Sequence, residues 1–192
     1  MATLTVYPDP NTETTSVDGY VGRANVGASF SDNRDGAGTE ADDSSTNAYG
    51  PQIGHHTTTN TYAIIRRLVT LFDTSALTSA ANISSAVLSY YFITRVNNYT
   101  GGEYNCLVTS NPASNTALVN ADYNVANFGT TELMTRQAWS ALTLNTYTDW
   151  TLNASGIAAI SKTGITKFGV RTAVDLDNGA TWQSGISDYL ES

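Results

Sequence analysis

The residues best suited to ligand chemistry lie in the segment 175–179, which reads Asp-Leu-Asp-Asn-Gly. Asp175, Asp177 and Asn178 offer two carboxylates and an amide oxygen, and Gly179 permits a sharp bend. Hard oxygen ligands at alternating positions of a bend suit Ca²⁺, although no glutamate follows at the distance that an EF-hand requires. We therefore expect Asp175, Asp177 and Asn178 to bind Ca²⁺. The alternative is a set of solvated turn carboxylates.

The other titratable residues give no catalytic pattern. His55 and His56 are adjacent, and neighbouring side chains of a strand point to opposite faces, so we expect a surface loop and no shared metal ion. No serine has the flanking glycines of a nucleophile elbow. Most carboxylates fall in turn sequences, where they commonly cap backbone N–H groups. We expect a protein that is not an enzyme, has no catalytic residues and requires no cofactor, with Ca²⁺ as an optional ligand.

Aromatic side chains suggest a second kind of binding. Trp182 stands between polar Thr181 and Gln183, so we expect it to be exposed and able to stack on a sugar ring. Trp150 lies in an alternating segment, where a core position is expected. Trp182 is therefore the candidate glycan-binding residue.

Composition excludes several partners. The chain has 192 residues and a formal net charge of −8, with a pI near 4.4. Lys162 and Lys167 are its only lysines. Binding to nucleic acid or to an anionic membrane surface requires a basic face, so we expect neither partner. Cys106 is the single cysteine; it excludes an intrachain disulfide and is expected to be buried. Residues 1–8 lack the basic start and apolar stretch of a signal peptide, which, if Met1 is native, predicts no ordinary secretion.

The hydrophobic pattern predicts strands along most of the chain. Threonine, tyrosine and turn-forming residues are abundant, which is typical of all-β proteins. A run at 61–72, apolar on both faces, predicts a central strand. Asn153 is the expected N-cap of one short helix over 154–162, and 114–128 is either a helical excursion or an irregular loop. The remaining expected strands are 2–7, 17–21, 26–30, 47–53, 85–96, 104–109, 147–152, 167–174 and 186–190.

These elements predict one all-β domain over residues 1–192, a single antiparallel β-sandwich of jelly-roll type. The run 67–77, Arg-Leu-Val-Thr-Leu-Phe-Asp-Thr-Ser-Ala-Leu, with the strand at 83–91, resembles the central signature of DNRLRE-type jelly-roll domains. The segment 18–21 is similar to the opening Asp-x-Tyr-Val of that family. The segments 109–118 and 160–164 are similar to predicted virion proteins of bacteriophages and to bacterial surface proteins. The family's motif is specific for the fold and not for a function.

The resemblance implies a viral structural protein located in the virion: a capsid decoration or auxiliary protein, or a tail-fibre or spike module, that assembles as a homo-oligomer. Its expected partners are copies of itself and other coat or surface proteins. One alternative is a carbohydrate-binding or adhesin module of a bacterial surface protein, located at the cell surface, with glycans as partners. Another is an extracellular filament subunit joined by strand exchange.

The two ends of the sequence are the candidate assembly elements. Family members usually continue with a further strand where this sequence ends at Ser192. Either 186–190 is the closing strand, or one sheet edge is left to pair with another chain. Residues 1–16 are the expected N-terminal strand or arm, which a neighbour could exchange, and its candidate assembly residues are Thr3, Leu4, Val6 and Tyr7.

Overall fold

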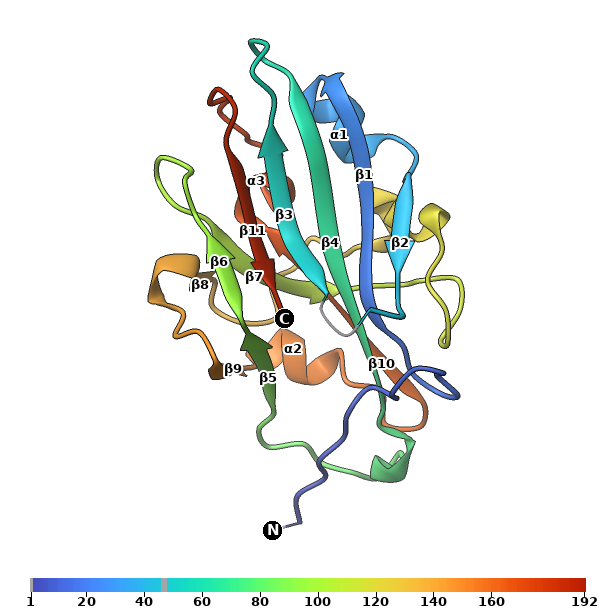
Figure 1. Ribbon diagram of the computed structural model, residues 1–192. Helices are drawn as coiled ribbons and strands as arrows, with labels where there is room; N and C mark the ends of the chain where they lie inside the picture. The colour runs from blue at the N-terminus through green and yellow to red at the C-terminus, as the bar shows by residue number, and fades with distance from the viewer. Residues whose placement is uncertain (1, 46–47) are drawn as a thin grey trace.

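A computed structural model describes residues 2–45 and 48–192 of the chain, and it is built mainly of antiparallel β-strands (Figure 1). The strands are β1 (Asp18–Ala28), β2 (Glu40–Asp42), β3 (Tyr49–His55), β4 (Tyr62–Asp73), β5 (Val87–Phe92), β6 (Thr94–Val96), β7 (Tyr104–Thr109), β8 (Gln137–Ala138), β9 (Thr146–Thr151), β10 (Ile165–Thr172) and β11 (Ser187–Glu191). The α-helices are α1 (Phe30–Asp35), α2 (Ala154–Ala158) and α3 (Ala173–Leu176). The 3₁₀ turns are η1 (Ser75–Leu77), η2 (Asn120–Tyr123), η3 (Val125–Asn127) and η4 (Trp139–Ala141).

Strand β4 is the centre of the larger sheet. This nine-stranded sheet has the order β6-β11-β3-β4-β10-β7-β8, and β1 and β2 extend it from β4. One edge of β4 pairs with β1, while the other edge is shared by β3, opposite residues 62–66, and β10, opposite residues 68–73. The strands on this edge of β4 therefore form two branches, one that begins with β3 and one that begins with β10. In Figure 1, β10 and β7 lie behind β3 and β11. Strands β5 and β9 form a separate two-stranded ribbon.

Two hydrophobic clusters lie on the two faces of β4. Leu68 and Phe72 belong to the cluster that also contains the inward-facing side chains of the β5–β9 ribbon. Ile65, Val69 and Leu71 belong to the second cluster. The expectation of a central strand that is apolar on both faces is confirmed, as is an all-β, sandwich-like antiparallel fold.

Most expected strands are present, with corrections. The single strand expected at 85–96 is two strands, β5 in the ribbon and β6 in the larger sheet. Residues 2–7 belong to no strand; they form an N-terminal arm outside both sheets. The segment 26–30 is the end of β1 followed by the start of α1, so it is not a separate strand. The expected strand at 47–53 is β3, with residue 47 outside the described residues. The segment 186–190 corresponds to β11, which pairs with both β3 and β6.

The helical expectations are partly met. Helix α2 begins at the predicted N-cap, where the Asn153 side chain accepts a hydrogen bond from Gly156 N, but it ends four residues before Lys162. The ambiguous segment 114–128 is an irregular loop that contains η2 and η3. Helices α1 and α3 were not expected. The second of these changes the geometry of the predicted calcium site.

Candidate functional site

The segment predicted to bind calcium is a buried helical turn rather than an open loop. Asp175 lies in α3, where its backbone N–H bonds the Oγ1 of the N-cap Thr172. Arg67 donates Nε and Nη2 to the Asp175 carboxylate oxygens at 2.8 Å each. Arg171 donates Nε and Nη2 to the same two oxygens at 2.8 and 2.9 Å. Both carboxylate oxygens of Asp175 are thus occupied by guanidinium groups.

Burial and charge act in opposite directions on Asp175. Burial disfavours its ionised form, but the Arg67 and Arg171 guanidinium groups outweigh burial and hold the pKa of Asp175 well below its usual range. The three side chains are buried, with exposed fractions of 1% or less for Asp175, Arg67 and Arg171. A carboxylate paired in this way is a structural ion pair and not a vacant cation ligand.

The other two predicted ligands point elsewhere. Both Asp177 oxygens accept 2.6 Å hydrogen bonds from Arg136, and these bonds hold the pKa of Asp177 below its usual value. Asn178 is exposed and has a positive φ of 54°. Within residues 2–45 and 48–192, no group of three His, Cys, Asp or Glu side chains could hold a metal ion. The structure therefore does not bring Asp175, Asp177 and Asn178 together as a ligand set.

Other titratable side chains are also buried, among them Glu103, Asp188 and His55. Burial raises the pKa of Glu103 to about 8; its Oε2 accepts bonds from the backbone N–H groups of Tyr104 and Ala173. Burial likewise raises the pKa of Asp188. His55, expected in a surface loop, is only 4% exposed, and burial lowers its pKa to about 4. These groups lie inside the fold, so the expectation for His55 is wrong.

Trp150 and Trp182 differ in burial. Trp150 is a core residue, as predicted, with 3% exposure. Trp182 is partly buried against the second hydrophobic cluster, and its indole N–H donates to the backbone oxygen of His56 at 3.0 Å. Glycan binding at Trp182 stays a prediction, with only part of the ring available for stacking.

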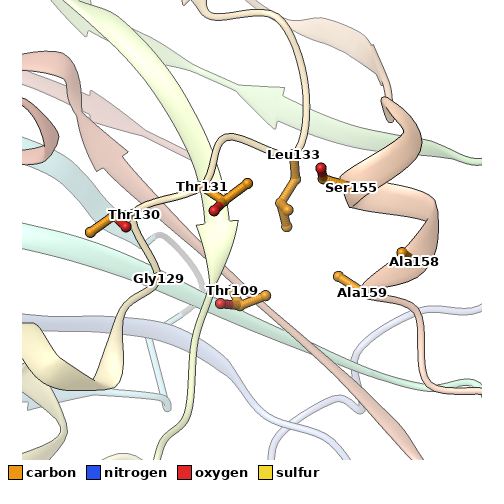
Figure 2. Close-up of a pocket in the computed structure, with 8 residues that line it drawn as sticks. All are labelled: Thr109, Gly129, Thr130, Thr131, Leu133, Ser155, Ala158 and Ala159. Atoms are coloured by element: carbon orange, nitrogen blue, oxygen red, sulfur yellow. The ribbon is translucent and has the colours of Figure 1, made fainter.

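A shallow hollow of about 390 Å³ lies between α2 and the end of β7. Figure 2 shows that small side chains line it: Thr109, Thr130, Thr131, Leu133, Ser155, Ala158 and Ala159, together with Gly129. The lining consists of hydroxyl and methyl groups and includes no titratable side chain. Such a surface offers hydrogen bonds and small apolar contacts but no acid–base chemistry.

The outer face of the β5–β9 ribbon carries the most notable exposed side chains. Strand β5 alternates, so that Val87 and Tyr91 point outward with 57% and 40% exposure. Tyr147 on β9 is 69% exposed, and its ring meets that of Tyr91 edge to face with centroids 5.3 Å apart. Between these residues, Ser89 donates a 2.6 Å hydrogen bond to Asp149. The result is an aromatic and apolar strip with one polar pair, which we call the ribbon face (Val87, Ser89, Tyr91, Tyr147, Asp149).

The N-terminal arm lies at the same end of the molecule as β5 (Figure 1). Of its predicted assembly residues, Thr3, Leu4 and Tyr7 are exposed, Leu4 by 41% and Tyr7 by 74%. Val6 is partly buried and packs against the hydrophobic cluster that contains Leu88, Tyr90 and Phe92. The arm is thus accessible for most of its length and has one point of attachment to the core.

Sequence reasoning missed both the ribbon face and the buried arginine pair. The signal for the ribbon face was the alternation in residues 87–92, which leaves Tyr91 on the side opposite to Tyr90. For Arg67 there was no local signal, because its partner Asp175 lies 108 residues away.

No helix in the described part of the chain has the length and apolar character needed to cross a membrane.

The comparisons with known proteins reveal no relative of this chain. No protein-family model, no curated protein and no solved structure matches this sequence significantly.

Proposed function

We propose that this protein is a non-enzymatic structural subunit that docks onto other protein chains through the ribbon face, and that it serves as a decoration or auxiliary protein of a phage capsid. The observation that carries this proposal is the exposure of Val87, Tyr91 and Tyr147 on one two-stranded ribbon. An exposed aromatic pair with an exposed apolar side chain on the same face is characteristic of interaction surfaces.

The charge pattern supports docking to protein. The chain carries a net charge of −8. Two of its arginines, Arg67 and Arg171, form buried ion pairs with Asp175 and so add no positive charge to the surface. An acidic surface keeps such a subunit soluble before assembly. The similarity of residues 109–118 and 160–164 to predicted virion proteins of bacteriophages supports a place in the virion.

The first test is mass spectrometry of gradient-purified virions of the phage whose genome carries this gene. We expect peptides of this chain at a copy number comparable with that of the major capsid protein. A gene outside any phage or prophage region, or a protein found in the cell-surface fraction and not in virions, would contradict the proposal.

The second test uses two matched substitutions. Val87→Arg places a charge on the ribbon face, while Val119→Arg places one at a valine of similar exposure, 50%, in the loop before η2. When the variants are supplied to particles that lack the protein, we expect Val87→Arg to reduce incorporation at least tenfold and Val119→Arg to be incorporated normally. Equal incorporation of both would remove the ribbon face from the proposal.

A carbohydrate-binding role is the second candidate, and the Tyr91–Tyr147 pair favours it. Two exposed rings beside the Ser89–Asp149 pair combine a stacking surface with polar groups that hydroxyls could bond. A glycan array is the test, with Tyr147→Ala and Trp182→Ala compared. Loss of binding in Tyr147→Ala assigns the sugar to the ribbon face, loss in Trp182→Ala assigns it to Trp182, and no binding by the unchanged protein contradicts this role.

A further inference from the structure

Strand β5 has an open edge. Its ladder with β9 continues to Ala86, whose oxygen accepts a 3.0 Å bond from Leu152 N. Backbone groups of alternate residues in an antiparallel strand face opposite edges. The N–H and C=O groups of Leu88, Tyr90 and Phe92 therefore face β9, and those of Val87, Ser89 and Tyr91 face away. No strand in the described ranges pairs along that outer edge.

The hydrogen-bonded ladder between β11 and β6 lies next to the open edge of β5. Strand β6 follows β5 after one residue, and β11 pairs with it antiparallel, with Glu191 opposite Thr94. Ile93 N donates to Glu191 O at 2.8 Å, whereas Phe92 O accepts from Asn145 N on the β9 side. Because Ile93 N points to the same side as the N–H groups of Val87, Ser89 and Tyr91, β11 occupies the continuation of the open edge. The β11 ladder covers β6 and stops short of β5, and among the described strands only β9 pairs with β5.

The N-terminal arm has the properties of a strand that could pair along this open edge. Residues 2–7 form no helix, strand or turn, and they make no backbone–backbone hydrogen bond within the described part of the chain. The arm has six residues, as β5 does. Leu4 and Val6 alternate with Thr3, Thr5 and Tyr7, so one side is apolar and the other is polar or aromatic. This alternation matches a position with a core on one side and solvent on the other.

We propose that residues 2–7 of one copy add as an antiparallel strand to the β5 edge of a second copy. Leu4 and Val6 then extend the inner row of Leu88 and Tyr90, and Thr5 lies beside Ser89 on the outer face. The main-chain hydrogen bonds supply affinity, and the alternation fixes which side faces the core. Reciprocal exchange of arms between two copies closes a twofold dimer, whereas one-way addition from copy to copy generates rings or filaments. This inference rests on the proposed role as an assembling subunit and names its partner as a second copy.

The decisive experiment is a disulfide cross-link between two different copies. Thr5→Cys is mixed with a size-tagged Ser89→Cys protein under mild oxidation, and the control partner is a tagged Thr151→Cys protein. Thr151 is exposed on the same ribbon but one strand farther from the open edge. The native Cys106 is buried and does not compete. We expect a mixed dimer with Ser89→Cys at least tenfold more abundant than with Thr151→Cys.

Two outcomes of this experiment overturn the inference. Equal yields with both partners, or no mixed dimer, mean that the arm does not lie beside β5 of another copy. A double variant, Thr5→Cys with Ser89→Cys, that forms only an intrachain disulfide means that the arm pairs with its own β5.

A backbone substitution gives an independent check. Ser89→Pro and Ser89→Ala both lose the bond to Asp149, but only proline removes the outward N–H, and the ladder to β9 does not use that group. Sedimentation velocity should show oligomers for the unchanged protein and Ser89→Ala, and monomers for Ser89→Pro and for a chain lacking residues 2–7. If Ser89→Pro does not fold, the arm deletion and the cross-link decide. A monomeric unchanged protein that is nevertheless found in virions would overturn strand addition and leave the proposed function intact.

Discussion

Arg67 and Asp175 form a two-pronged ion pair in the interior of the protein, with both N–O distances at 2.8 Å and exposures of 0% and 1%. Arg171 approaches the same carboxylate from β10, at 2.8 and 2.9 Å. Arg67 also donates to the backbone oxygens of Tyr123 and Arg34. Arg67 and Asp175 together therefore connect the central strand with α1, α3, η2 and β10.

Removal of the Asp175 charge should destabilise the fold strongly. Asp175→Asn leaves two buried guanidinium groups without their counter-ion, and breaking a buried pair in this way costs about 3–5 kcal/mol. Urea unfolding measures the loss. The matched control is Asp177→Asn, whose pair with Arg136 is half exposed and contributes about 1 kcal/mol or less. Equal losses in the two variants would contradict the structural role of the buried pair.

Calcium should not stabilise the protein. Both Asp175 oxygens accept bonds from arginine, and those of Asp177 are bound to Arg136. A ligand that binds only the folded state raises the melting temperature. We therefore expect the same melting temperature in millimolar calcium and in excess chelator. A higher temperature with calcium, lost in Asp177→Asn, would restore the cation site at 175–179.

Stability should fall as the pH rises toward 8 because of Glu103. Burial raises the pKa of Glu103 in the folded protein from its usual 4.5 to about 8. Between these values the folded state holds a proton that the unfolded state has released. The contribution of Glu103 protonation to the free energy of unfolding is therefore complete below about pH 4.5 and is lost as the pH rises to about 8. In Glu103→Gln, the free energy of unfolding should lose a pH-dependent part on the order of a few kcal/mol. Unfolding curves from pH 5 to 9 measure it, with Glu13→Gln as the surface control. A slope unchanged in Glu103→Gln would contradict this assignment.

The thiol of Cys106 should be inert until the protein unfolds. Cys106 is fully buried in β7, and burial raises the pKa of its thiol to about 12. Thiolate is the reactive form, so a thiol reagent should label the folded protein at least a hundredfold more slowly than the protein in denaturant. Rapid labelling without denaturant would show that β7 opens locally.

Local patterns were sufficient to predict most strands. The run 61–72 is apolar on both faces, and it is the central strand β4. Asn153 and the apolar spacing after it located the start of α2. Residues 2–7 show the limit of such patterns, because alternation describes a side-chain arrangement and does not supply a neighbouring strand. The arm has the pattern and lacks the partner.

The candidate sites were less predictable. The segment 175–179 has the composition of a calcium loop, but the guanidinium groups that occupy Asp175 come from β4 and β10, and no local spacing reveals them. The ribbon face required knowledge that β5 and β9 pair with Tyr91 opposite Tyr147.

The buried arginines also restrict which strand alignments this polar sequence can adopt. Strands rich in threonine can slip past one another at small cost when both faces tolerate polar side chains. In the observed alignment, Leu68 of β4 lies opposite Val170 of β10, which brings Arg67 and Arg171 to the same carboxylate. A shift of β10 by two residues would preserve the face of every side chain but would separate Arg171 from Arg67 by about 7 Å along the strand. The ion cluster thus favours the observed register of β4 and β10. It disfavours shifted registers that would bury the same hydrophobic side chains but would break the ion pairs.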